Sequence, residues 1–507
     1  MRGGMPKALT FTASVIAILA LAACSSGSEG EGKSDSETRV GSPPGAAQSQ
    51  APSQEAEAAL ASYVGKFSLS PGHGTIGSVV TATGTGFPTD ATLDIVWQAY
   101  TGRWNVDGEK YLGREYGEKL EPMTSVRTDA AGAFEAKITI PEGFGFYHDV
   151  RVMQDRVLRN KAAFYVDMEV TISPTSGPVG TPITIEARGI GWRPLQSNWD
   201  LIYDNRFTGF ISAVSTNGMA KVTIPATGAP GKHIVSILHG SFTFPYMNMQ
   251  QSPEPDRPTW NFEFTITKGN PVLPQAIDKQ SLARDRQEIQ AARAGPSIAT
   301  DWQSGTVGSP ITLRGTGFAP NAAVELQWFR VSGNRVGGQG WEENATILGK
   351  MTVGGDGSFT LPLATLDDLG GDHRIEARVG ADKAAQTSYT ITPSAAPLSP
   401  SSGPVGTTMT IHLKGGGWTE TANIYTVVYD NAYIGYSCAF NSQGDITVYL
   451  PAVGEPGWHF IDLYPAIYKG KETPGVETFR IPQLSFALDH PGEKLPAFRF
   501  AFLVTED

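Results

Sequence analysis

The sequence contains little cysteine and little charge, and both shortages narrow the kind of protein it can encode. Only Cys24 and Cys438 occur among 507 residues, so disulfides cannot hold together a series of small extracellular domains. Charged residues make up 18 % of the chain, and the formal net charge is -11. An acidic chain without basic clusters is not expected to bind nucleic acid.

Motifs for catalysis and for metal binding are also missing. No G-x-S-x-G elbow, Walker loop or dinucleotide fingerprint occurs. The eight histidines do not follow a metal-site spacing such as H-E-x-x-H, and no Asp-x-Asp-x-Asp run points to calcium. We therefore predict that the chain is not an enzyme and that it holds neither a metal nor a cofactor.

What is present begins with the amino terminus. Arg2 and Lys7 precede an uncharged, mostly apolar run at 8–23, which is too short to span a bilayer comfortably and is typical of a signal peptide. The run ends in Leu-Ala-Ala-Cys at 21–24, which resembles the bacterial lipobox. The resemblance implies cleavage before Cys24 and lipidation of its sulfur, so that the mature chain is anchored on the extracytoplasmic face of a membrane, at the cell surface.

Two segments have compositions unlike the rest of the chain. Residues 24–62 are rich in Ser, Gly, Pro and Gln and poor in apolar residues, which predicts a flexible tether. Within it, 54–63 could form a short helix. Residues 275–294 contain no Gly or Pro and many Gln, Ala, Arg and Glu, which predicts one helix that serves as a semi-rigid linker.

Most of the remaining chain is an internal repeat. Residues 173–233 match 399–459 without a gap, and the two stretches share Ser-Gly-Pro-Val-Gly-Thr, Gly-x-Gly-Trp, Tyr-Asp-Asn, Pro-Ala-x-Gly-x-Pro-Gly and a final His. A second pair matches 77–87 with 308–318. The order of these units is A-B-A′-B′, as expected for a two-domain unit that has been duplicated.

Each unit has short stretches in which apolar and polar residues alternate, separated by Gly and Pro turns. Alternation with a period of two places one face of a strand in a core and the other in water. We therefore predict an all-β fold of four tandem immunoglobulin-like β-sandwiches. The predicted parts are a signal peptide (1–23), the tether (24–62), domain A (63–168), domain B (169–268), the helical linker (269–296), domain A′ (297–393) and domain B′ (394–507).

The two B-type units resemble the IPT/TIG family of immunoglobulin-like domains. The resemblance is carried by Ser-Pro-x-Ser-Gly-Pro-Val-Gly-Thr, an alternating strand and Gly-x-Gly-Trp, over 173–192 and 399–418. It is looser over 77–87 and 308–318. The resemblance implies a secreted binding or spacer module without catalysis. The chain departs from it by a Trp in place of the usual Phe and by long insertions near 98–130 and 240–262.

Several recurring side chains are expected to serve the fold. Tyr-Asp-Asn at 203–205 and 429–431 predicts a tight hairpin turn, because Asp and Asn tolerate positive φ. One His stands before the final apolar strand of each unit and is expected to hydrogen-bond a main-chain carbonyl, and one Trp per unit is expected in the core. The histidines are His148, His233, His373 and His459, and the tryptophans are Trp97, Trp192, Trp328 and Trp418.

Other aromatic residues do not recur in register and are the remaining candidates for ligand contact. Apart from Trp199, they are Trp104, Trp260, Trp341 and Trp458. The plain alternative is that they cover the ends of the sandwiches. The function that we expect is a binding or adhesion module for an unknown protein or glycan. The alternatives are a structural spacer or scaffold of an envelope complex and a polysaccharide-binding accessory lipoprotein.

Overall fold

A computed structural model describes residues 63–506, with gaps at 194–195, 242–243, 252–257, 276–294, 335–339 and 469–479. The predicted signal peptide, Cys24, the tether, the short helix at 54–63 except Tyr63 and nearly all of the predicted linker helix lie outside the described residues. Contacts within the chain join the described residues into one compact unit.

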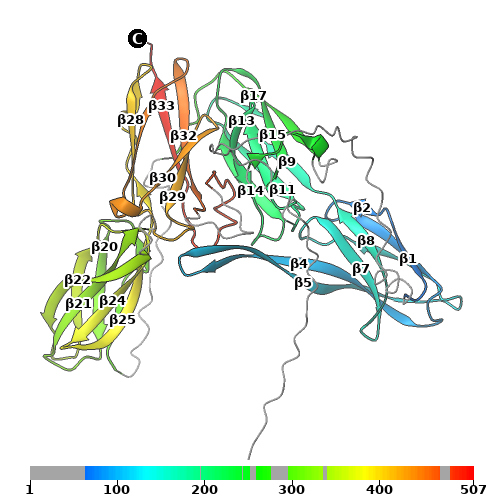
Figure 1. Ribbon diagram of the computed structural model, residues 1–507, viewed down its shortest axis with the longest axis horizontal. Helices are drawn as coiled ribbons and strands as arrows, with labels where there is room; N and C mark the ends of the chain where they lie inside the picture. The colour runs from blue at the N-terminus through cyan, green and yellow to red at the C-terminus, as the bar shows by residue number, and fades with distance from the viewer. Residues whose placement is uncertain are drawn as a thin grey trace, which may run out of the picture. The chain divides into compact units, whose positions relative to one another are not determined.

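Four β-sandwiches follow one another along the chain and share one plan (Figure 1). Each pairs a three-stranded sheet with a five-stranded sheet, to which domain B adds the short strand β16. No α-helix occurs among the described residues, where η1 (Met249–Gln251) and η3 (Phe440–Ser442) are short 3₁₀ turns. The predicted fold class, an all-β chain of tandem immunoglobulin-like sandwiches, is confirmed. In the described part of the chain, no helix has the length and apolar character needed to cross a membrane.

The two A-type domains have sheet orders β1-β3-β6 with β2-β8-β7-β4-β5 and β18-β20-β23 with β19-β25-β24-β21-β22. Domain A consists of β1 (Lys66–Ser70), β2 (His73–Gly74), β3 (Val79–Thr85), β4 (Thr92–Asp107), β5 (Lys110–Arg127), β6 (Phe134–Thr139), β7 (Phe146–Gln154) and β8 (Val157–Val166). Domain A′ consists of β18 (Ser297–Thr300), β19 (Ser304–Gly305), β20 (Pro310–Thr316), β21 (Ala323–Asn334), β22 (Gly340–Thr352), β23 (Phe359–Ala364), β24 (Gly371–Val379) and β25 (Asp382–Ile391).

The two B-type domains have orders β14-β11-β9 with β10-β17-β15-β12-β13 and β26-β28-β31 with β27-β33-β32-β29-β30. Domain B consists of β9 (Glu169–Ser173), β10 (Ser176–Gly177), β11 (Pro182–Arg188), β12 (Trp199–Tyr203), β13 (Arg206–Ile211), β14 (Met219–Pro225), β15 (Gly231–Ser241), β16 (Phe244–Pro245) and β17 (Trp260–Ile266). Domain B′ consists of β26 (Ser394–Ala395), β27 (Ser402–Gly403), β28 (Thr408–Lys414), β29 (Ile424–Tyr429), β30 (Ala432–Cys438), β31 (Ile446–Pro451), β32 (Gly457–Ala466) and β33 (Phe498–Val504).

The same strand pairing closes all four sandwiches. A two-residue strand near the start of each domain pairs in parallel with its last strand: β2 with β8, β10 with β17, β19 with β25, and β27 with β33. The core strands alternate as predicted, since every second residue of β11 is buried from Ile183 to Ala187. Each domain thus has its own apolar core between its two sheets.

The recurring tryptophans divide into two groups. Trp97 and Trp328 are buried in the A-type cores, where they stack on His148 and His373 with ring centroids 4.5 Å and 4.8 Å apart. The expectation that Trp192 and Trp418 also lie in a core is wrong. Both are half-buried and contact an aromatic ring of the preceding domain, Tyr100 for Trp192 and Trp341 for Trp418.

The junction between an A-type domain and the next B-type domain is built twice in the same way. Gly145 bridges to Gly191, and Gly370 bridges to Gly417. A Cβ on Gly145 would stand 1.8 Å from the Gly189 carbonyl oxygen, and one on Gly370 would stand 2.0 Å from that of Gly415. Only glycine allows such a close approach of two main chains.

Domain B also packs against domain B′ and the long β4–β5 hairpin. Tyr111, Phe210, Ile467 and Ile481 form one buried apolar cluster drawn from domains A, B and B′. Beside it, the buried carboxylate of Asp489 accepts hydrogen bonds from Trp104 Nε1, the Ser212 and Ser215 hydroxyls and the Val214 and Ser215 amides. These contacts join the two halves of the chain.

Candidate ligand-binding cavity

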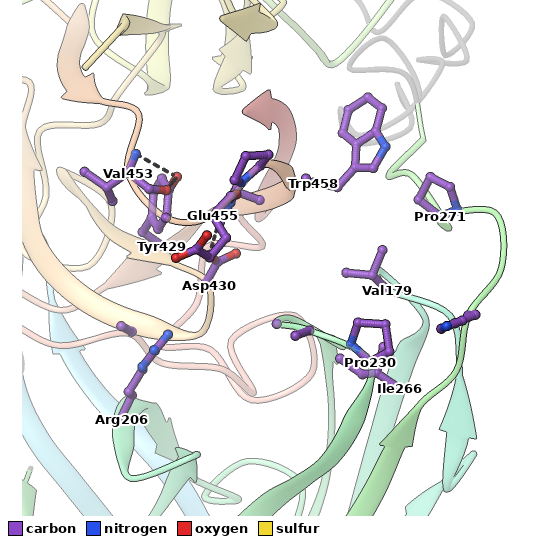
Figure 2. Close-up of a pocket in the computed structure, with 18 of the residues that line it drawn as sticks. Val179, Arg206, Pro230, Ile266, Pro271, Tyr429, Asp430, Val453, Glu455 and Trp458 are labelled. Carbon is purple, nitrogen blue, oxygen red and sulfur yellow. Dashed lines mark hydrogen bonds and ion pairs between the residues drawn. The ribbon is translucent and has the colours of Figure 1, made fainter. Parts of the chain in front are cut away.

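A cavity of about 990 Å³ lies between domains B and B′ (Figure 2). Much of its wall comes from equivalent loops of the two domains, which face each other. Residues 228–230 follow β14, and 454–459 follow β31, at positions that the repeat relates. Arg206, the first residue of β13, and Ala432, the first residue of β30, also line the cavity, and the turn before β30 adds Asp430.

Apolar side chains line most of the cavity. In Figure 2, Trp458 and Pro271 are both drawn at the upper right, with Val179 and Pro230 below them and Val453 at the left. Among the lining residues, Ile434 is 52 % exposed and Val453 is 47 % exposed, so water touches apolar surface that no other part of the described chain covers. The apolar lining residues are Val179, Pro230, Ile266, Pro271, Ile434, Leu450, Pro451, Val453, Pro456 and Trp458.

A histidine holds the B′ loop of the cavity in place. The Nδ1 atom of His459 lies 2.6 Å from Asp430 Oδ2, and its Nε2 atom lies 2.9 Å from the Glu455 carbonyl oxygen. Burial disfavours the charged imidazole, but the Asp430 carboxylate and the Glu455 carbonyl outweigh it and raise the pKa of His459. The protonated ring can donate to both oxygens, which ties the loop at 454–456 to the hairpin turn.

Domain B repeats this arrangement on the other wall. His233 places Nδ1 2.6 Å from Asp204 Oδ2 and Nε2 2.8 Å from the Ala229 carbonyl. In the A-type domains, His148 and His373 place both ring nitrogens near main-chain carbonyls instead. The prediction that each recurring histidine bonds a main-chain carbonyl is confirmed, and in all four domains that carbonyl belongs to the residue four positions earlier.

The Tyr-Asp-Asn stretches are hairpin turns, as predicted. Asp204 and Asn205 have φ of 49° and 61°, and Asp430 and Asn431 have φ of 46° and 59°. The tyrosine before each turn also fixes a cavity loop. The Tyr203 hydroxyl donates to the Thr227 carbonyl, and the Tyr429 hydroxyl donates to the Val453 carbonyl at 2.8 Å. Burial raises the pKa of Tyr429 to about 12, so its phenol stays a donor.

Besides the paired Asp430 and His459, three side chains offer charge at the cavity wall. Arg206 and Lys268 come from domain B, and Glu455 comes from domain B′. All three are exposed. The rim therefore carries charge of both signs around an apolar interior.

The structure does not bring together the four candidate tryptophans. Only Trp458 lines the cavity. Trp104 donates its Nε1 hydrogen to Asp489, 2.9 Å away. Trp260 packs edge-on against the buried Trp199 at 5.3 Å, and Trp341 packs against Trp418 and Phe440.

The other predicted features have less to do with this cavity. Cys24 lies outside the described residues. Cys438 has intermediate exposure, and burial raises the pKa of its thiol to about 11. Within the described ranges, no group of three or more His, Cys, Asp or Glu side chains could hold a metal ion.

Comparisons with known proteins give likeness of fold alone. No protein-family model matches the chain, and no curated protein matches it. Invasin, described as a bacterial integrin-binding protein, is 11 % identical, with 83 % of this chain and 79 % of invasin covered and a TM-score of 0.18. A putative membrane-anchored protein of Corynebacterium diphtheriae is 8 % identical, with 87 % and 91 % covered and a TM-score of 0.17.

A third match is the α-2-macroglobulin of Salmonella, at 10 % identity and a TM-score of 0.19. It covers 87 % of this chain, which spans only 31 % of that protein's length.

Proposed function

We propose that this chain is a binding module displayed on a bacterial cell surface, with its ligand site in the cavity between domains B and B′. The observation that carries the proposal is a cavity of about 990 Å³ whose wall is mostly apolar and includes the half-buried ring of Trp458. Ligand sites in proteins are typically concave, mostly apolar and about 300–1,000 Å³ in volume.

The lining favours an apolar segment of a partner protein as the ligand. Trp458, four prolines and several aliphatic side chains offer surface for packing, and burial of apolar area supplies most of the free energy of such contacts. Arg206, Lys268 and Glu455 can pair with charged residues beside that segment. A glycan would need more hydrogen-bonding side chains than this wall offers. The test must therefore distinguish glycan binding from peptide binding.

Display at the surface rests on the amino terminus. Lipidation of Cys24 would hold the chain on a membrane, since each buried methylene contributes about 0.8 kcal/mol. The tether would then let the domains reach away from that membrane. We assign no catalytic role and no cofactor to the chain in this proposal.

The test compares the full chain with Trp458→Ala and with Tyr147→Ala, a matched loss of an exposed ring outside the cavity (Tyr147 is 53 % exposed). Each is assayed against an array of peptides from bacterial and host surface proteins and against a polysaccharide panel. We expect peptides that bind the wild type and the Tyr147 variant at least tenfold more tightly than the Trp458 variant. Loss of polysaccharide binding alone would favour the accessory-lipoprotein function, and binding that ignores Trp458 would contradict the proposed site.

A scaffold function is the second candidate, because an apolar cluster and several hydrogen bonds join different domains. The Asp489 carboxylate alone joins the β4–β5 hairpin to domains B and B′. If the chain is a scaffold, crosslinking in intact cells should recover the same envelope proteins with wild type and with Trp458→Ala. A partner set that depends on Trp458 would argue for the binding module instead.

A further inference from the structure

Domain B contains a buried polar pair that its fold does not explain. Asp200 on β12 and the preceding Asn198 are both 0 % exposed. Neither carboxylate oxygen of Asp200 and neither amide atom of Asn198 has a hydrogen-bond partner among the described residues. A buried polar group without a partner is unfavourable, and a buried ionised one is strongly so, so these four atoms call for a ligand.

The two side chains converge on one point beside β15. A Cβ placed on Gly240 would lie 2.3 Å from Asp200 Oδ2 and 3.1 Å from Asn198 Nδ2. Glycine at this position therefore makes room for the Asp200 carboxylate, which lies against β15 together with the Asn198 amide. The oxygen and nitrogen of an amide are interchangeable by a flip of the side chain, so Asn198 can also present its oxygen there.

Domain B′ shows that the sandwich does not require these residues. The repeat places Ile424, Thr426 and Ala466 at the positions of Asn198, Asp200 and Gly240, and β12 pairs with β15 in the same register as β29 pairs with β32. The Thr426 hydroxyl donates to the Tyr464 carbonyl, 2.8 Å away, while Ile424 and Ala466 are buried and apolar. The polar side chain at this position thus has a hydrogen-bond partner in domain B′, whereas its counterpart in domain B has none among the described residues.

A second aspartate shows how this chain treats a buried carboxylate that serves the structure. Asp489 is also 0 % exposed and accepts five hydrogen bonds. For Asp200, burial alone raises the pKa well above its usual range, with no cationic side chain opposing it. Among the described residues, neither a hydrogen-bond donor nor a positive charge is in place for an ionised Asp200.

We propose that Asp200 and Asn198 form an internal site for a hard metal cation, bound through carboxylate and amide oxygens. These oxygens are the ligands that such cations prefer, and main-chain carbonyls and water commonly complete the shell. One carboxylate gives the site a single negative charge, which a monovalent or a divalent cation can neutralise. The site is independent of the cavity at Trp458.

The test measures thermal unfolding of the full chain after chelation, in a buffer whose only cation is tetramethylammonium, and again with Na⁺, Mg²⁺ or Ca²⁺ added. We expect one of these ions to raise Tm by several degrees, because binding to the folded state alone stabilises it. Asp382→Asn, which removes an exposed carboxylate, should keep the full response. Asp200→Asn and Asp200→Thr should lose it.

Asp200→Thr installs the residue that domain B′ uses, so it keeps the test valid if the amide variant fails to fold. Native mass spectrometry of the wild type should show one bound ion per chain, absent in Asp200→Thr. A wild type whose Tm responds to none of the ions and that carries no ion would mean that water or a proton satisfies Asp200, and would overturn the proposal. An ion response retained in Asp200→Thr would overturn it as well.

Discussion

Domains B and B′ are two copies of one sandwich, and their equivalent residues divide into two kinds. His233 and His459, with the aspartate of each hairpin turn, make the same contacts in both copies. Asp200 and Thr426 occupy equivalent positions but differ in their hydrogen bonds. The Thr426 hydroxyl donates to a main-chain carbonyl, whereas the Asp200 carboxylate has no partner among the described residues. A residue that recurs in both domains with the same contacts serves the fold. A buried residue that differs between the two domains serves a function that only one of them has.

The same reasoning applies to the surfaces of the two copies. Asn431 of domain B′ donates to the Pro225 carbonyl and the Thr227 hydroxyl of domain B, while its counterpart Asn205 is exposed. Val428 and Tyr464 of B′ pack against the core cluster of B. Copies that are alike within their cores therefore became different where they touch each other, and the cavity lies along that contact.

The largest effect is expected at the repeated A–B junction. Gly145→Ala and Gly370→Ala should each destabilise the chain by about 2 kcal/mol or more, because the new methyl would overlap a main-chain carbonyl. Chemical denaturation measures the loss. The matched control is Gly72→Ala, where a Cβ would meet nothing within 4 Å. If one junction tolerates alanine and the other does not, the two junctions do not share the same close contact between main chains.

A smaller effect should separate the hairpins of domains A and A′. Trp104→Phe keeps an aromatic ring but removes the donor to the buried Asp489 carboxylate, which should cost about 1.5–3 kcal/mol. Trp341→Phe removes an Nε1 group that is buried without an acceptor among the described residues. It should leave stability unchanged within about 0.5 kcal/mol or increase it. Equal losses, measured by denaturant unfolding, would show that the Asp489 contact contributes nothing.

Features that repeat along the chain could be predicted from its sequence, and features formed between copies could not. The strands, the turns at Asp204 and Asp430 and the role of the four histidines depend on short-range chemistry, and four copies repeat the signal. Trp192 and Trp418 recur as well, and their recurrence predicts a place in the core. Their contacts are instead with the preceding domain, which no single repeat reveals.

The cavity and the buried aspartates escaped prediction for a physical reason. The cavity walls come from loops about 226 residues apart in sequence, and only the packing of two sandwiches places them together. Trp458 was one of four candidate rings, with nothing in its neighbours to rank it first. Asp489 lies in a stretch outside the repeat, although the mismatch between Asp200 and Thr426 was visible in the alignment and was a usable signal.

A third prediction concerns pH and the loop at 454–456. Because the folded pKa of His459 is raised, its contribution to stability is full below about 6.5, the pKa of an unfolded histidine, and is lost as pH rises through the folded pKa. Tm should therefore fall over this window in the wild type and fall less in His459→Gln. His412→Gln, at an exposed contact with Thr447, is the control. A pH response unchanged in His459→Gln would show that Asp430 and Glu455 do not hold the loop through this ring.

The smallest effect is expected at another pair of equivalent positions, Ser212 in domain B and Cys438 in domain B′. Ser212 donates to Asp489, 2.7 Å away, whereas Cys438 is the one cysteine among the described residues, and burial raises the pKa of its thiol to about 11. At pH 7.5 the thiolate fraction is then roughly 0.03 %, against about 10 % for an ordinary thiol. Reaction of the folded chain with a disulfide reagent should be at least tenfold slower than that of the chain unfolded in denaturant. Equal rates would mean that the thiol is open to solvent, and that this position in B′ is not packed like its counterpart in B.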